Sequence, residues 1–288
     1  MLKNRVIAVI FVRDEIAVQS IKFKNFLPVG RPEIAAESFN MWGVDEIILL
    51  DISATHKNKI IDIHLVDRVA SACAVPLTVG GGVKTLQDAG TLLEAGADKI
   101  CINSAILDDN NCLQDAHQKY GCQCMVGAID FVEKDGLHLI YDYRLGRPTS
   151  QTLIDAIYDY IDRGVGELLI NDVERDGSQR GFNTDLIAEV TAASSVPIIW
   201  CGGAGHPDDF VHALRAGPLS GIAAGNIFHF NEHSINIVKS RVARDIPLRQ
   251  DTQTNYKNVP LAANGRISKL PEEALERLLF EKLEVEII

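Results

Sequence analysis

The sequence repeats itself over a long period. The segment VPLTVGGGVKTLQDAGTLLEAGADKICINSA, from Val75, aligns without a gap on VPIIWCGGAGHPDDFVHALRAGPLSGIAAGN, from Val196, at an offset of 121 residues. The same offset pairs acidic residues in two further apolar runs, Glu46 with Glu167 and Asp51 with Asp172. Self-similarity at this distance predicts a fold assembled from two equivalent halves.

Short apolar runs alternate with helix-like segments throughout both halves. The runs cover residues 6–12, 46–51, 76–80, 99–103, 124–130, 167–172, 197–202 and 221–225. Among the helix-like segments, one has Pro32 in its first turn and Gly43 after its last, and another opens on Thr85 and closes on Gly96. Eight buried strands, each followed by a helix, predict an α/β fold: a parallel (β/α)8 TIM barrel of two duplicated half-barrels. A doubly wound open sheet is the alternative.

The pattern changes past about residue 250. Residues 250–269 are polar and rich in turn formers, whereas residues 270–288 begin as an amphipathic helix with Pro271 in its first turn. We therefore expect a barrel domain over 1–250, followed by a linker and a C-terminal helix over 251–288. The extension is either a tail that packs on the barrel or a docking element for another protein.

Charge and cysteine usage restrict the partners. With 39 acidic and 28 basic residues the net charge is −11, which argues against nucleic acid or an anionic membrane as the main partner. The first apolar run is too short to cross a membrane. The six cysteines and the late histidines lack metal-ligand spacing, so we expect reduced thiols in a cytoplasmic protein without metal or cofactor.

Two glycine clusters occupy equivalent places in the halves. GGG (80–82) and CGGAG (201–205) each follow a strand and precede a helix, where backbone N–H groups can bind a phosphate dianion. Asn103 and Ser104 in one half, and Gly225 and Asn226 in the other, end the next strand and can complete each cradle. A ligand with a phosphate at each end would fit such a pair. Tight turns that need positive φ are the alternative explanation.

The strand ends of the two halves differ at one position. At an offset of 119 residues Phe11 corresponds to Asp130, so the two should face each other across the C-terminal mouth of the barrel, where such barrels carry their chemistry. A phenyl ring can neither donate nor accept a proton.

Four motifs resemble the cyclase subunit of imidazole glycerol phosphate synthase, a bienzyme of histidine biosynthesis, over about residues 1–245. They are VDEIILLDISA, GADKICINSA, ELLINDVERDGSQRGFNTDLI and VPIIWCGGAG. The resemblance implies a glutaminase subunit at the N-terminal face of the barrel. It also implies that ammonia passes through the barrel to a bisphosphorylated ribulosyl aminoimidazole at the mouth. Two Asp residues at the ends of strands 1 and 5 then act as acid and base; Asp130 matches one, and Phe11 occupies the place of the other.

The resemblance also implies roles for three further sets of residues. The phosphate-binding set is Gly81, Gly82, Asn103, Ser104, Gly177, Gly202, Gly203, Gly225 and Asn226. A salt-bridged ammonia gate comprises Arg5, Glu46, Lys99 and Glu167, with Asp98 beside it as a contact to the glutaminase. Other residues expected at the mouth are Asp51, Asp172, Asp176 and Arg144.

The mouth departs from the family pattern while the gate does not. Gln19 stands where the family has Lys, Glu174 where it has Asp, and YDYRLGRPTS, with Arg144 and Pro148, replaces a loop that contacts substrate. SIKFKNF (20–26) is similar to paralogues found with surface-polysaccharide genes. In these the barrel is thought to carry ammonia to an ATP-dependent amidotransferase that makes acetamidino sugars. We expect this function; the ordinary cyclase reaction and a non-catalytic scaffold that activates the glutaminase are the competitors.

Overall fold

The computed structural model describes residues 3–108, 111–249, 256–268, 271 and 273. The chain divides into two compact units, Met1–Lys257 and Asn258–Ile288. In the second unit, Leu261 and Ile267 form an isolated antiparallel bridge. The helix predicted over 270–288 lies, apart from residues 271 and 273, outside the described residues.

Within the described part of the first unit, eight parallel strands close into a barrel. They are β1 (Arg5–Arg13), β4 (Glu46–Asp51), β5 (Leu77–Gly80), β6 (Lys99–Ile102), β7 (Met125–Lys134), β10 (Glu167–Asp172), β11 (Ile198–Cys201) and β12 (Gly221–Ala224). Each pairs with the next in this order, and β12 pairs with β1 to close the ring. The prediction of a (β/α)8 barrel is confirmed, and the open sheet is excluded because it would leave two edges unpaired.

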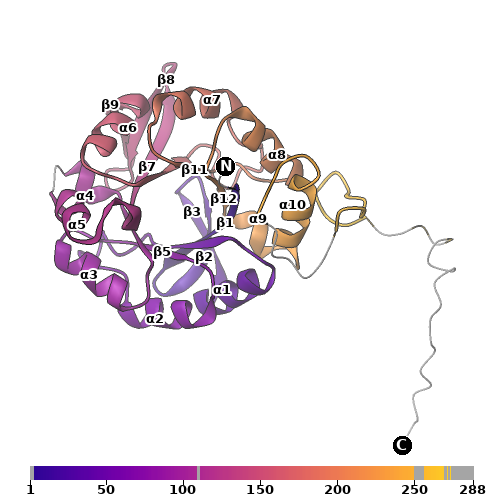
Figure 1. Ribbon diagram of the computed structural model, residues 1–288, viewed down its shortest axis with the longest axis horizontal. Coiled ribbons are helices and arrows are strands. Elements are labelled where there is room, and N and C mark those ends of the chain that lie inside the picture. Colours follow the sequence, from indigo (N-terminus) through magenta and orange to yellow (C-terminus); the bar gives the residue numbers. More distant parts are fainter. Residues whose placement is uncertain (1–2, 109–110, 250–255, 269–270, 272, 274–288) are drawn as a thin grey trace, which may run out of the picture. The chain divides into compact units, whose positions relative to one another are not determined.

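Helices surround the strands in an outer ring, which Figure 1 shows from one end of the barrel. In the first half they are α1 (Pro32–Met41), α2 (Ile63–Ala72), α3 (Leu86–Glu94), α4 (Ser104–Leu107) and α5 (Cys112–Tyr120). In the second half they are α6 (Leu153–Asp162), α7 (Thr184–Ala193), α8 (Pro207–Ala216), α9 (Asn226–His229) and α10 (Ser234–Val242). A 3-10 turn, η1 (Cys122–Cys124), precedes β7. The predicted helix starts are confirmed: Pro32 opens α1, and Thr85 caps α3 in a reciprocal pair with Asp88.

Each half also carries a hairpin that the sequence analysis missed. β1 continues into β2 (Ile16–Ile21) and β3 (Asn25–Gly30), and β7 continues into β8 (Leu137–Asp142) and β9 (Arg147–Thr152). The first turn of each hairpin has two residues with positive φ, Asp14-Glu15 and Asp135-Gly136. This conformation suits the twist of paired strands. YDYRLGRPTS is therefore not a loop but the end of β8, a turn and most of β9.

The sheet register shows that Phe11 and Asp130 are equivalent. Phe11 pairs with Leu50 on the neighbouring strand, and Asp130 pairs with Asn171. Leu50 and Asn171 are themselves related by the 121-residue offset. The two dyads therefore occupy the same place in the two halves, at the C-terminal ends of the strands.

Apolar side chains form two cores on either side of the strands. The larger core fills the space between strands and helices. The smaller one fills the barrel interior with Ile7, Val9, Phe11, Ile48, Cys101, Val126, Ala128, Leu169, Ile199, Cys201 and Ala223, together with Val18 of β2. Burying each aliphatic side chain stabilises the fold by roughly 1.5 to 3 kcal/mol. The interior is consequently a packed apolar column that leads from one face of the barrel to the other.

Candidate active site

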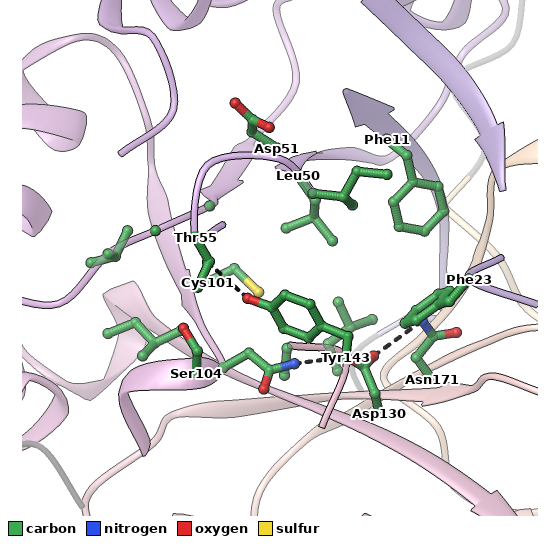
Figure 2. Close-up of a pocket in the computed structure, with 18 of the residues that line it drawn as sticks. Phe11, Phe23, Leu50, Asp51, Thr55, Cys101, Ser104, Asp130, Tyr143 and Asn171 are labelled. Carbon is green, nitrogen blue, oxygen red and sulfur yellow. Dashed lines mark hydrogen bonds between the residues drawn. The ribbon is translucent and has the colours of Figure 1, made fainter. Parts of the chain in front are cut away.

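A pocket of about 110 Å³ lies at the C-terminal ends of the first-half strands and of β7 and β10. Most of its lining is apolar, and Figure 2 shows the aromatic rings of Phe11, Phe23 and Tyr143 around it. Its polar side chains include Asp51, Asn103, Ser104, Asp130 and Asn171. A largely apolar cavity with a few converging polar groups is the usual form of a small-molecule site.

Asp130 is the buried acid of this pocket. Its carboxylate accepts hydrogen bonds from Asn103 Nδ2 at 2.8 Å and from Asn171 Nδ2 at 3.3 Å. Burial raises the pKa of Asp130 from 3.8 to about 7, against the opposing effect of the two amide donors. A carboxyl that titrates near neutral pH can both donate and accept a proton.

We expect Asp130→Asn to stabilise the protein in a pH-dependent way. The folded state holds the Asp130 proton up to a pKa of about 7, whereas the unfolded chain releases it near 3.8, so the wild type loses stability as the pH rises between these values. At pH 8 the variant should gain on the order of 2 to 4 kcal/mol in unfolding free energy, and near pH 3.5 the difference should vanish. Urea unfolding across this range measures it.

Glu133→Gln, on the exposed end of the same strand, is the control and should change little at any pH. A gain from Asp130→Asn that stays constant with pH would show that burial of the ionised carboxylate is not its cause.

Phe11 closes the opposite side of the mouth. It is 4% exposed, and its ring contacts that of Phe23 edge-on, with centroids 6.4 Å apart. Phe23 in turn meets Tyr141 of β8 in the same manner. Phe11 also lines a second cavity of about 20 Å³, whose remaining walls belong mainly to the second half. The ring therefore lines both cavities, at the position where the family resemblance implies a second carboxylate.

The first glycine cluster lies on the wall of the main pocket. Gly81 and Gly82 have φ of +132° and +70°, and a Cβ on Gly82 would lie 1.9 Å from the carbonyl oxygen of Lys59. Close backbone approach thus requires glycine here whether or not phosphate binds. Nearby, the Tyr143 hydroxyl donates to Thr55 Oγ1 at 2.8 Å and shares a hydrogen bond with Ser104.

The second glycine cluster lines the smaller cavity together with Gly177, Gly225 and Asn226. A Cβ on Gly203 would lie 2.2 Å from the Gly181 carbonyl oxygen, as at the equivalent position in the first half. The structure therefore groups each predicted phosphate set at one end of the mouth. Positive φ and backbone crowding account for Gly81, Gly82, Gly177, Gly202 and Gly203, so the phosphate role stays a prediction.

The β2–β3 hairpin bonds to two residues that line the smaller cavity, Asp176 and Asn226. Ser20 Oγ donates to Asp176 Oδ2 at 2.6 Å, and Asn226 Nδ2 donates to the Ser20 carbonyl at 2.7 Å. Burial raises the pKa of Asp176 to about 6, although Ser20 and the backbone of Phe23 and Lys22 oppose this. Asp176 is thus a second carboxyl that titrates close to neutrality, at the hairpin.

The other residues predicted at the mouth lie in different places. Asp51 lines the main pocket but caps its own turn, accepting from Ser53 N and Oγ, each at 2.7 Å. Asp172 lines a different, polar cavity, near Arg175. Arg144 pairs with Asp142 at 2.8 Å and with Asp108 at 2.6 Å, outside the pocket lining. Two residues depart from the family pattern. Gln19 is buried on β2, whereas Glu174 is exposed and lines the polar cavity.

At the opposite end of the barrel the four predicted gate residues meet. Arg5 bonds to both Glu46 and Glu167, and Lys99 Nζ lies 3.1 Å from Glu46 Oε1 and 2.9 Å from Glu167 Oε2. Two positive and two negative side chains alternate in a closed ring. Burial alone would raise the pKa of Glu167, but Arg5 and Lys99 outweigh it and hold the pKa below its usual value.

Two hydroxyl groups that the sequence analysis did not single out complete the ring. Ser220 Oγ accepts from Arg5 and donates to Glu167 Oε1 at 3.0 Å, and Thr78 Oγ1 donates to Glu46 Oε1 at 2.9 Å. Ser220 stands at the position equivalent to Lys99 under the 121-residue offset, and this relation could have identified it. Asp98, adjacent to the gate, is exposed and accepts a hydrogen bond from Leu77 N at 2.8 Å.

In the described ranges, no group of three or more His, Cys, Asp or Glu side chains could hold a metal ion. All six cysteines are free thiols. No helix within those ranges has both the length and the apolar character needed to cross a membrane.

Comparison with known proteins identifies the family. The family described as "Histidine biosynthesis protein" matches residues 5–234. A Vibrio vulnificus (strain YJ016) protein named "Putative imidazole glycerol phosphate synthase subunit hisF2" is 38% identical over 267 residues, which is 92% of this chain and 98% of that protein. The resemblance drawn from the motifs is confirmed: the chain belongs to the histidine biosynthesis protein family, among the barrels similar to the cyclase subunit of imidazole glycerol phosphate synthase.

Proposed function

We propose that this barrel delivers ammonia rather than closing an imidazole ring. A cytoplasmic glutaminase docks at the gate face, with Asp98 among its contacts, and ammonia passes through the barrel interior. At the mouth a separate ATP-dependent amidotransferase uses the ammonia to convert an N-acetyl amino sugar of surface polysaccharide into its acetamidino form. One observation carries the proposal: the gate ring is complete, whereas Phe11 replaces the carboxylate that should oppose Asp130.

The interior chemistry supports passage of neutral ammonia. Between gate and mouth the interior core consists of aliphatic side chains, two thiols and the ring of Phe11. Burial raises the pKa of Cys101 to about 12 and raises that of Cys201 further, so both thiols stay uncharged. An ammonium ion would lose its hydration without compensation in such a column, whereas ammonia would lose far less.

Two other functions remain as competitors. In the first, the chain is an ordinary cyclase in which water substitutes for the missing carboxylate; complementation of a histidine auxotroph would support it. In the second, the chain is a scaffold that activates the glutaminase, and both cradles bind no phosphorylated ligand. The pairing of Asp130 with Asn103 and Asn171 in a formed pocket favours a working mouth over a scaffold.

We expect the purified wild type to show no ammonia-dependent turnover of the bisphosphorylated ribulosyl aminoimidazole substrate. A general acid or base typically contributes roughly 10²- to 10⁴-fold in rate, and Phe11 removes one of the two. Phe11→Asp should restore at most part of this rate, because Phe23 and Tyr143 still narrow the pocket. Consumption of ammonium and formation of the imidazole product are measured together.

Phe11→Asn is the matched control, since it opens the same space as Phe11→Asp without a carboxylate and should remain inactive. Robust turnover by the wild type would overturn the proposal and identify a histidine-pathway enzyme.

A further inference from the structure

The pocket floor is polar on one half and apolar on the other. Asp130 and Asn171 are neighbours in the sheet register, and the equivalent neighbours in the first half are Phe11 and Leu50. All four line the same pocket, and Figure 2 shows Asp130 and Asn171 together, with Phe11 and Leu50 elsewhere on the wall. Any small polar molecule at this level therefore has hydrogen-bonding partners on one side.

Asn171 has an unused acceptor at this point. Its Nδ2 donates to Asp130, while its Oδ1 is buried and has no hydrogen-bond partner among the described residues. The residue is 6% exposed and lines the pocket. A buried polar atom without a partner destabilises the fold, and a bound donor would recover that loss.

The position of Asn171 connects it to the gate. Glu167, Leu169 and Asn171 alternate along β10, and these three belong to the gate ring, the interior core and the pocket lining respectively. A strand rises about 3.3 Å per residue, so the Cα atoms of Glu167 and Asn171 lie about 13 Å apart along β10. A molecule that travels up the interior meets the Asn171 amide as it enters the pocket.

The hydrogen-bonding capacity of the dyad favours one kind of molecule. Asn171 and Asn103 each donate one N–H of Nδ2 to Asp130, so an ionised Asp130 and the free Oδ1 together offer acceptors. Ammonia has three N–H donors and one lone pair, whereas water has equal numbers of each. Two acceptors on one side would hold two N–H groups and leave the lone pair directed away from them.

We propose that Asn171 is a positioning residue that holds neutral ammonia at the pocket floor, with Oδ1 and the Asp130 carboxylate each accepting one N–H. The inference rests on the proposed function, because it supposes that ammonia arrives through the interior. It assigns the second-half side of the pocket to ammonia. The apolar dyad of Phe11 and Leu50 then lies across the pocket from the two hydrogen-bond acceptors.

Nuclear magnetic resonance of the full chain with 15N-labelled asparagine tests this. The side-chain signals of Asn171 and Asn103 are followed as ammonium chloride is added at alkaline pH, against sodium chloride at equal ionic strength. Both signals should shift saturably with ammonia and not with sodium. Asn103 serves as the reporter in variants because its Nδ2 also binds Asp130.

Asn171→Leu introduces the residue found at the equivalent first-half position, Leu50. It should raise the ammonia concentration that gives half of the Asn103 shift about tenfold, the equivalent of one lost hydrogen bond. Asn171→Thr keeps an acceptor oxygen and should stay within about threefold of wild type. The pKa of Asp130, read from its carboxyl carbon, should rise in Asn171→Leu because one donor to the carboxylate is lost.

The absence of a saturable shift in the wild type, or an unchanged response in Asn171→Leu, would overturn the inference. Its failure is distinguishable from failure of the proposed function. Turnover of the cyclase substrate by the wild type would contradict the proposed ammonia delivery, whereas the titration tests whether ammonia binds at Asn171.

Discussion

Gly82→Ala should lower the free energy of unfolding more than a change to alanine at any other positive-φ glycine. The added Cβ would lie 1.9 Å from the Lys59 carbonyl oxygen and 2.9 Å from its carbon, both backbone atoms, and φ at this position is +70°. Backbone strain and a clash that a side chain cannot relieve act together. We expect a loss of about 4 kcal/mol in unfolding free energy, measured by urea denaturation.

Gly136→Ala separates the two causes. Gly136 has φ of +76°, yet nothing lies within 4 Å of an added Cβ, so this variant carries the conformational strain alone and should lose about 1 kcal/mol. Gly203→Ala, the repeat equivalent of Gly82, should resemble Gly82→Ala because its Cβ would meet the Gly181 carbonyl oxygen at 2.2 Å. If all three variants lost the same amount, crowding would not be the reason for glycine in the clusters.

The barrel could be predicted because its strands are short apolar runs and its helices have clear end signals. Each predicted run lies on a barrel strand, and Thr85 caps its helix as the sequence suggests. The equivalence of Phe11 and Asp130 also followed from counting, since two copies of one strand must share a register in a duplicated barrel. The fold and its two equivalent halves could therefore be predicted from short sequence patterns and their spacing.

The hairpins could not be recognised from apolar runs. β3 is exposed along nearly its whole length, and it pairs with β2 along one edge. Its residues therefore lack the alternation that marks a half-buried strand. The Asp135-Gly136 dipeptide, between alternating segments, was the usable signal for the second hairpin, and the repeat would have extended it to the first.

The sequence pointed to the four charged gate residues and to the neutral Asn103, but not to three further neutral residues. The family resemblance pointed to a ring of Arg5, Glu46, Lys99 and Glu167, and the structure brings these four side chains together. Ser220, Thr78 and Asn171 are uncharged, and their importance follows from barrel closure, which places strands distant in sequence side by side. Arg144, expected at the mouth, pairs with Asp142 and Asp108, and the sequence does not reveal these partners.

Glu46→Leu should be among the most damaging substitutions outside the glycine turns. Glu46 is 1% exposed and accepts from Arg5, Lys99 and Thr78, so its loss leaves two cations against the single carboxylate of Glu167. Removing one partner of a buried ion pair commonly costs 3 to 5 kcal/mol, and the partly exposed cations place this case at about 3 kcal/mol. Urea unfolding at low and high salt measures the loss.

The double variant Glu46→Leu/Lys99→Met decides whether the ring acts as one unit. It restores charge balance, one cation to one anion, so it should be more stable than Glu46→Leu alone. Lys57→Gln, which breaks the exposed pair with Asp14, is the control and should leave stability unchanged. A double variant as unstable as the sum of its single variants would mean that the four charges contribute independently. The ring would then be four independent charges rather than a closed, neutral entrance to the barrel interior.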